Sequence, residues 1–283
     1  MAMTIYKDFA HAHAHLHSLL MTQAVLMHRG TWQGIDVQKK PEMGAFELNH
    51  VLVQVKLDTN MVDHYRQDIK PNLPWADDHF AERVGGNPLN PGKEWRNWPW
   101  GKNADKFRID PESVGDPTRE PVFDHTYSQR YWPKHAGMYS HGIIDPAMPA
   151  PVHRGIYFPY GDLRDVVNEL ATDPTTRQAV LPMFFPEDTG LRPGRRKPCS
   201  ISYHFIISAK NEFDIFYHLR SCDFVRHFAD DMYLTVRLHL WVLERLREMS
   251  IRWQHIVPGW FNCYIGNLHI FRNDRNAPKE IKT

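Results

Sequence analysis

Cys199 is the residue of this chain best suited to covalent chemistry. It follows Pro198 at the start of a strand-like segment, and the basic run LRPGRRK (191–197) comes directly before that proline. Positive charge beside a cysteine favours the thiolate, which is the nucleophilic form. A single cysteine is more often a small buried residue, so Cys199 needs support from other segments.

That support comes from segments that accompany Cys199 in a fixed order. They are DPTTRQAVLPMF (173–184), RSCD (220–223), a helix pattern opening at Asp231, and GNLHIF (266–271). Together they resemble the thymidylate synthase family over residues 155–274. WADDHFAERVGGNPLNP (75–91) also resembles phage-type pyrimidine hydroxymethylases, so within the family the chain is most similar to the deoxycytidylate (dCMP) hydroxymethylases.

The resemblance implies a fold and an assembly. We expect a single domain over residues 1–283 with a three-layer α+β fold, in which helices pack on a large mixed β-sheet. The family's subunits pair sheet against sheet, so we expect a homodimer in which an arginine reaches the partner's site. Arg177 matches that arginine, although Gln178 replaces the family's second one.

The resemblance also implies a reaction. The Cys199 thiolate would add to C6 of a pyrimidine nucleoside monophosphate, and C5 would then attack the methylene of 5,10-methylenetetrahydrofolate, the expected cofactor. Arg220 and Ser221 match residues that bind the phosphate, and Arg29 in HRGTWQ (28–33) is a further candidate. Each arginine could instead be a solvated surface charge.

Other site residues follow from the same match. Asp223, which we group with the catalytic residues, matches an aspartate that helps to hold the base, and His269 matches a histidine that contacts the sugar. Phe271 stands where the family has tyrosine, so the choice between ribose and deoxyribose stays open. Glu82 is our candidate for acid–base work and Asp78 the alternative, although both could be surface carboxylates.

Position 231 distinguishes between the possible bases. Thymidylate synthases have Asn there, whose amide accepts from N3–H of uracil and donates to O4. Cytosine presents the opposite pattern, which suits a carboxyl group: one oxygen accepts from the 4-amino group, and a shared proton bonds N3. Asp231 therefore favours a cytosine nucleotide, and a mispaired buried group would cost about 1–3 kcal/mol. Asp231 could also be only the N-cap of its helix, and Asp230 lies beside it.

The expected product depends on access of water. Thymidylate synthases carry a long C-terminal segment that closes over the folate, whereas only RNAPKEIKT (275–283) follows Asp274 here. Water would then capture the methylene and give a 5-hydroxymethyl product, as in DNA modification. The Trp-rich insert at residues 94–101 could form a lid instead.

Composition excludes several classes of protein. Lys and Arg total 34 and Asp and Glu 33, a net charge of +1, so the chain lacks the positive charge of a typical nucleic-acid-binding protein. No apolar run is long enough for a membrane helix, and no signal peptide is evident. The 3 cysteines suit a reducing compartment. We expect a cytoplasmic protein, in the host if viral, with no membrane or nucleic-acid partner.

Hydrophobic periodicity predicts the elements that position these residues. We expect helices at residues 5–28, 161–172 and 231–248, and strands at 45–58 and at the C-terminal WFNCYIGNLHIF (260–271). We also expect a turn followed by a strand in DPTTRQAVLPMFF (173–185), and a hairpin of two strands around AKN (209–211). Residues 66–160 are rich in Pro, Trp, Gly and Asn and should be irregular with short helices. Tyr131, Trp132 and Lys134 within them are candidates to line a pocket.

Several alternatives stay open at this point. Within the family these are a CMP hydroxymethylase of nucleoside biosynthesis and a methyltransferase of dCMP or dUMP that keeps the reductive step. A non-catalytic nucleotide- or RNA-binding relative would have no need of Cys199. A metal-dependent enzyme using the 18 histidines is disfavoured, because neither HExxH nor CxxC occurs.

Overall fold

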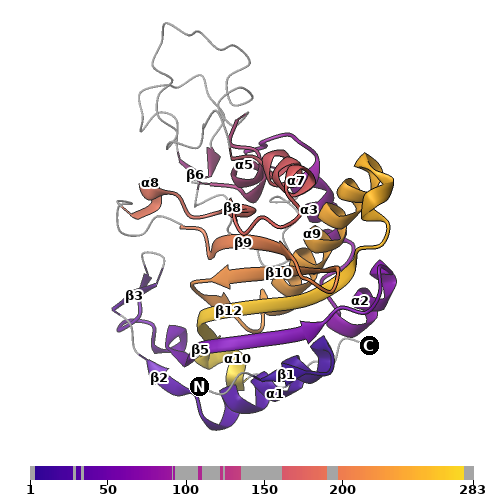
Figure 1. Cartoon of the computed structure of the whole chain (residues 1–283). Coiled ribbons are helices and arrows are strands. Elements are labelled where there is room, and N and C mark those ends of the chain that lie inside the picture. Colours follow the sequence, from indigo (N-terminus) through magenta and orange to yellow (C-terminus); the bar gives the residue numbers. More distant parts are fainter. Residues whose placement is uncertain are drawn as a thin grey trace, which may run out of the picture.

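The computed structural model describes residues 4–27, 30–32, 35–90, 92, 108–109, 122–123, 125–134, 161–189 and 197–276. These residues form an α+β fold around one large mixed sheet (Figure 1). The predicted fold class is therefore confirmed.

The large sheet has eight strands. They are β1 (Ile5–Tyr6), β2 (Val25–Met27), β5 (Ala45–Lys56), β8 (Val180–Pro182), β9 (Ser200–Ile207), β10 (Glu212–Leu219), β11 (Cys222–Asp223) and β12 (Val257–Phe271). The order is β1-β5-β12-β10-β9-β8, with β2 paired to β5 and β11 to β12. The β1–β5, β10–β12 and β11–β12 pairs are parallel and the others antiparallel.

The two faces of this sheet differ in burial because side chains alternate along each strand. One face carries a cross-strand row of almost fully buried residues: Val53, Cys263, Tyr217, Tyr203 and Leu181. On the opposite face, Phe216 is 41 % exposed and Tyr264 36 % exposed. The first face is the core of the molecule, and the second is only partly covered.

Helix α9 (Phe228–Met249) packs on the buried face of the sheet. Its residues Leu234, Leu238, Val242 and Leu246 are buried and recur every four positions, which gives one apolar stripe. His239, also buried, contacts the carbonyl oxygen of Phe213 in β10 through Nε2 at 2.6 Å. The apolar stripe and this polar contact together fix the helix on the sheet.

The N-terminal helix is shorter than predicted. Helix α1 spans Phe9–Thr22 because Asp8 caps it, accepting the N–H of His11 at 2.7 Å, and Asp68 accepts the N–H groups of Phe9 and Ala10. The ends of the predicted 5–28 segment instead pair with β5 as β1 and β2.

The remaining elements are short. The helices are α2 (Val62–Ile69), α3 (Trp75–Val84), α5 (Tyr127–Tyr131), α7 (Leu163–Thr172), α8 (Pro186–Thr189) and α10 (Arg272–Asn276), with 3-10 turns at Pro41–Met43 and Ile251–Trp253. Two small ribbons pair β3 (Thr31–Trp32) with β4 (Ile35–Asp36) and β6 (Arg108–Ile109) with β7 (Val122–Phe123). None of the described helices is long and apolar enough to span a bilayer.

The other predicted elements agree with the structure. The strand at 45–58 is β5, the helix at 161–172 is α7, and the hairpin around AKN joins β9 to β10. Asn211 in its turn has φ 59°, a left-handed conformation that asparagine tolerates. Within the irregular stretch 66–160, the described parts include α3 and α5.

A buried ion pair fastens α5 to α8. Arg130 and Asp188 bond through two N–H···O contacts of 2.8 and 2.9 Å, and their side chains are only 2 % and 4 % exposed. The guanidinium also lies over the ring of Phe185, 4.4 Å from its centroid.

Asp188→Ala should destabilise the protein strongly, by about 3–5 kcal/mol, because it leaves the Arg130 charge buried without a counterion. Glu248→Ala, which breaks the exposed Arg245–Glu248 pair, is the control and should change the free energy of unfolding by less than about 1 kcal/mol. Urea unfolding measures both. Equal small losses would contradict the structural role given to the buried pair.

Candidate active site

Cys199 lies half-buried directly before β9, beside Arg220 at the end of β10. The N–H of Arg220 donates to the carbonyl oxygen of Cys199 at 2.9 Å. The Arg220 side chain folds back along the same segment, donating to the carbonyl oxygens of Pro198 at 2.7 Å and Lys197 at 3.0 Å. Its Nη2 is then 4.0 Å from the sulfur of Cys199. The structure thus places a fixed cation beside the predicted nucleophile.

Tyrosine hydroxyls surround the residue that follows the nucleophile. Ser200 Oγ is 2.6 Å from the hydroxyl oxygen of Tyr217 and donates to that of Tyr127 at 3.3 Å. Burial raises the pKa of Tyr127 to about 12 and that of Tyr217 well above its usual value. Both phenols are therefore neutral at physiological pH. Sequence patterns did not identify either one.

The RSCD and GNLH segments meet because β11 pairs with β12. Asp223 lies opposite His269 in this ladder, and Ser221 Oγ is 3.5 Å from Nδ1 of His269. Gly266 allows the close approach: a Cβ there would lie 3.0 Å from the carbonyl oxygen of Arg220. The residues predicted to bind phosphate and sugar are thus brought together, although far apart in sequence.

Asp223 shapes the turn between β11 and α9. One carboxylate oxygen accepts the backbone N–H groups of Val225 and Arg226 at 3.0 and 3.1 Å, and the other pairs with the Arg226 side chain at 2.8 Å. The geometry gives Asp223 a positioning role, and its catalytic role stays a prediction.

The two adjacent aspartates of α9 have different surroundings. Asp230 is buried and accepts both the backbone N–H and the side-chain amide of Asn72 at 2.8 Å. Asp231 points instead to the Cys222 thiol, with its Oδ2 3.7 Å from the sulfur. The N-cap is His227, so Asp231 does not have the N-cap role considered as an alternative.

The pKa of the Asp231 carboxyl group lies close to neutral pH. Burial raises its pKa, the Arg83 cation opposes this increase and the nearby Asp230 adds to it, so that the pKa of Asp231 is about 7. A carboxylic acid that is partly protonated at neutral pH can both donate and accept hydrogen bonds.

The face that helix α3 buries does not include Glu82 or Asp78, the two candidates for acid–base work. Its buried residues are Ala76, His79, Phe80 and Arg83, spaced three and four apart. Glu82 is half-buried against Gly92, where an added Cβ would clash with its carboxylate, and Asp78 is exposed. The acid–base role of Glu82 stays a prediction. The helical spacing of the buried set was the signal that could have identified Arg83.

We call the following residues the cluster around Cys199: Cys199, Ser200, Tyr127, Tyr217, Arg220, Cys222 and Asp231. Other predicted residues lie away from this cluster or outside the described residues. Arg177 is exposed, and its carbonyl oxygen is 3.1 Å from Nε2 of His204 in β9. Arg29 and the insert 94–101 lie outside the described residues. Tyr131 is fully buried, and Lys134 pairs with Asp165 in α7.

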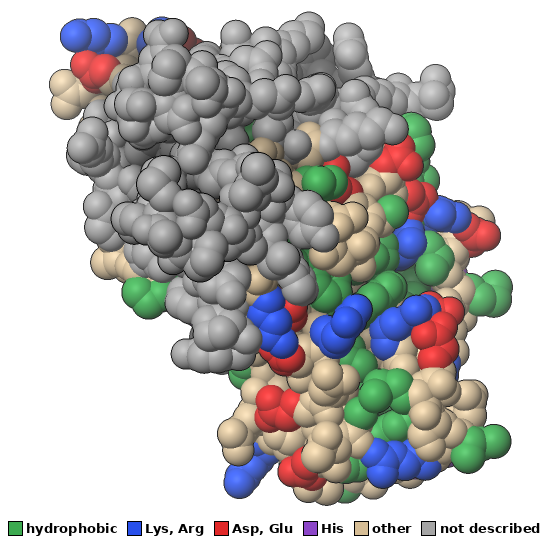
Figure 2. Space-filling view, turned by 90° about the horizontal axis from the view of Figure 1, so that it is seen from above, with side chains coloured by type: hydrophobic (Ala, Val, Ile, Leu, Met, Phe, Trp, Pro, Cys, Tyr) green, Lys and Arg blue, Asp and Glu red, His purple; other side chains and the backbone are tan. Residues whose placement is uncertain are grey.

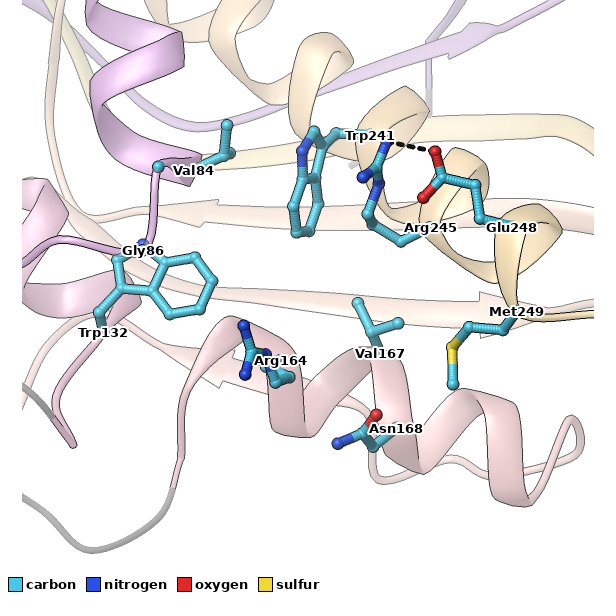
Figure 3. Close-up of a pocket in the computed structure, with 11 residues that line it drawn as sticks. Val84, Gly86, Trp132, Arg164, Val167, Asn168, Trp241, Arg245, Glu248 and Met249 are labelled. Carbon is cyan, nitrogen blue, oxygen red and sulfur yellow. Dashed lines mark ion pairs between the residues drawn. The ribbon is translucent and has the colours of Figure 1, made fainter.

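A separate hollow of about 420 Å³ lies between α3, α7 and the C-terminal end of α9 (Figure 3). Trp132, predicted to line a pocket, lies on its wall with Trp241 and Arg164. Cys199, Asp231 and the other predicted catalytic residues do not line it. This hollow is therefore distinct from the cluster around Cys199.

On the face seen in Figure 2, the described basic and acidic side chains lie interspersed. Among the residues that the structure describes, no group of three or more His, Cys, Asp or Glu side chains could hold a metal ion.

Comparison with known proteins identifies a family relationship. The family model described as thymidylate synthase matches residues 78–281, which include the whole cluster around Cys199. None of the curated proteins compared with the chain gives a match.

Asp231→Asn should change the pH dependence of stability. The pKa of Asp231 is raised on folding from 3.8 to about 7, so between these pH values the folded protein keeps a proton that the unfolded chain releases. The free energy of unfolding of the wild type is therefore highest below pH 4 and falls as the pH rises to 7. Relative to wild type, the variant should therefore gain about 2–4 kcal/mol between pH 4 and pH 8, since one pKa unit is about 1.4 kcal/mol.

Urea unfolding across this pH range measures the difference. Asp58→Asn, at a side chain that is 74 % exposed, is the control and should follow the wild-type curve. Parallel curves for wild type and Asp231→Asn would contradict the raised pKa.

Proposed function

The chain belongs to the thymidylate synthase family, and from this premise we propose that it 5-hydroxymethylates a cytosine nucleotide, dCMP, with 5,10-methylenetetrahydrofolate as the one-carbon donor. The family itself transfers one-carbon units to pyrimidine nucleotides. The proposal adds the base and the product, and it makes the chain a dCMP hydroxymethylase.

The environment of Asp231 is the observation that carries this proposal. The carboxylate of Asp230 accepts two hydrogen bonds from Asn72, whereas the carboxyl group of Asp231 lies beside the Cys222 thiol, within the cluster around Cys199. Its pKa of about 7 provides the protonated form at neutral pH. Such a group can donate to N3 of cytosine while accepting from its 4-amino group, the pattern that uracil cannot satisfy.

The same proton takes part in the first chemical step. As the Cys199 sulfur bonds to C6, the C5=C6 electron pair moves towards C4, and the C4=N3 pair moves onto N3. N3 then takes the proton of Asp231, which is left as a carboxylate. Both electron pairs are accounted for, and C5 becomes the nucleophilic carbon of an enamine.

Arg220, Ser221 and His269 are proposed to hold the phosphate and sugar. The guanidinium of Arg220 can form the paired hydrogen bonds that phosphate favours. Ser221 Oγ and the imidazole of His269 lie 3.5 Å apart, so one ligand can contact both. Arg29 and the partner's copy of Arg177 would complete this site.

The folate would bind against the exposed side of this cluster. Tyr127 is half-buried near Cys199, and the face of its ring that Arg83 does not cover offers a flat surface suited to a pterin. When bound, the folate supplies a one-carbon unit at the oxidation level of formaldehyde. After the transfer, C5 would lose its proton and the one-carbon unit would lose its bond to the folate nitrogen, which leaves an exocyclic methylene on C5. Water would add to this methylene, Cys199 would leave C6 as the thiolate, and the proton on N3 would return to Asp231.

A homodimer is proposed through the partly covered face of the sheet. Phe216 and Tyr264 lie there in adjacent strands, more exposed than is usual for large apolar side chains. Arg177 lies next to His204 on the same face, so it is well placed to reach a partner.

Tritium release from C5-labelled dCMP, CMP and dUMP tests the base and the product. We expect release from a cytosine nucleotide in the presence of methylenetetrahydrofolate, without formation of dihydrofolate, because water and not hydride completes the product. Cys199→Ser should abolish release. Asp231→Asn should shift preference towards dUMP by roughly ten- to hundredfold, because the amide matches uracil.

Each other outcome identifies a different function. Release with dihydrofolate would indicate a methyltransferase, and release from CMP alone a ribonucleotide enzyme. Release only from dUMP would overturn the role given to Asp231. Binding of nucleotides without release would indicate a non-catalytic relative.

Mixed dimers test the cross-subunit role of Arg177. Arg177→Ala and Cys199→Ser homodimers should both have low activity. Mixing them should restore up to about one functional site per dimer, because one site then has its own Cys199 and an intact Arg177 from the partner. Arg164→Ala, at another exposed arginine, is the control for Arg177→Ala and should keep full activity. Absence of restoration in confirmed mixed dimers would contradict the assignment.

A further inference from the structure

Arg83 is a buried arginine without a described ion-pair partner. It is 4 % exposed, like Arg130 at 2 %, but Arg130 has Asp188 as its counterion. Among the described residues, no carboxylate lies within ion-pair distance of Arg83. A buried cation without a counterion costs several kcal/mol, so its retention suggests a use beyond folding.

The side chain of Arg83 is held in a definite orientation. Its Nε donates to Nε2 of His79, one turn earlier in α3, at 3.0 Å. Burial and the Arg83 charge lower the pKa of His79 well below its usual value, so the imidazole is neutral and can accept this bond. The carbonyl oxygen of Arg83 accepts the indole N–H of Trp132 at 2.8 Å, which anchors the backbone.

This orientation directs the guanidinium to the cluster around Cys199. It lies over the ring of Tyr127, 4.2 Å from the centroid, and the hydroxyl of Tyr127 bonds Ser200, the neighbour of Cys199. The charge of Arg83 also reaches Asp231, where it favours the ionised form. Helix α3, which carries Arg83, also packs against α9, which carries Asp231, so the cation and the carboxyl group belong to neighbouring elements.

We propose that Arg83 is a positioning residue that acts through Asp231, stabilising the carboxylate formed when Asp231 gives its proton to N3 of the base. The inference rests on the proposed function. His79 serves this role by accepting a hydrogen bond from the guanidinium, and the ring of Tyr127 holds the cation beside the site. The proton moves from Asp231 to N3 as the bond from sulfur to C6 forms, and it returns when that bond breaks.

Other titratable groups also face Asp231 and must be considered. They come from every element around it: Asp230 in α9, Cys222 and Asp223 in β11, Tyr127 and Tyr131 in α5, Tyr217 in β10, Cys263 in β12, and Arg83 in α3. Arg83 is the cation of this set. Its removal should therefore raise the titration midpoint of Asp231 and leave the carboxyl a weaker acid.

Titration of Asp231 by NMR, with 13C-labelled aspartate, tests this without substrate. The signal is assigned by its loss in Asp231→Asn. We expect a midpoint near 7 in wild type, a rise of about one unit or more in Arg83→Met, and a midpoint close to wild type in Arg83→Lys. Arg237→Met is the matched control: Arg237 also stacks on an aromatic ring, that of Phe80, but pairs with Asp77 and should leave the midpoint unchanged.

Tritium release then tests the consequence for the reaction. Because Asp231 is protonated when the base binds, Arg83→Met should lower kcat roughly tenfold or more with little change in KM, and Arg83→Lys should recover most of the loss. A merely structural role would not shift the Asp231 midpoint or be rescued by lysine.

The outcomes separate the two proposals. An unchanged Asp231 midpoint in folded Arg83→Met would overturn the role of Arg83, whatever the substrate. A shifted midpoint without any tritium release from cytosine nucleotides would support the electrostatic coupling and overturn the proposed reaction. If Arg83→Met does not fold, comparison of Arg83→Gln with Arg83→Lys decides: equal midpoints would overturn the proposal.

Discussion

The packing of α9 against the buried face of the sheet is the constraint on which the candidate site depends. Its apolar stripe fixes the helix across β10 and β12, and its first turn therefore lies at the ends of β9 and β11, where Cys199 and Cys222 are found. Asn72 donates two hydrogen bonds to Asp230, and the carboxyl group of the next residue, Asp231, lies at the Cys222 thiol. If the sequence of α9 were shifted by one residue, Asp230 and not Asp231 would take the position beside Cys222.

Burial has a different consequence for each charged group near this helix. Asp230 is satisfied by amide donors, and Arg130 by a carboxylate with matched geometry. Burial raises the pKa of both aspartates, but the hydrogen bonds from Asn72 oppose the increase at Asp230, whereas the pKa of Asp231 rises to about 7. Arg83 has a neutral imidazole and a tyrosine ring in place of a counterion. The two groups whose charges are not locally matched are the two that the proposed reaction needs.

Much of the framework could be predicted from sequence because it follows from periodicity. The alternation in β5 and the 3–4 spacing in α9 each identify a buried face, and the order of RSCD and GNLHIF indicates which strand ends meet. The start of α1 was missed although Asp8 is a local N-cap, whereas the two hydrogen bonds that Asp68 in α2 accepts could not be predicted from local sequence. Arg83 was missed for a related reason: charged residues are expected outside, and only the shared spacing with Ala76 and Phe80 indicates otherwise.

The pairing of an acid near its titration point with a buried cation fits a proton that must move in both directions. A carboxyl with an ordinary pKa would bind cytosine poorly at neutral pH, because N3 would meet a carboxylate. A carboxyl buried without Arg83 would hold its proton too firmly to release it to the base. Burial raises the pKa of Asp231 and Arg83 lowers it, so the two protonation states become close in energy. Base recognition and activation can then depend on the same hydrogen bond.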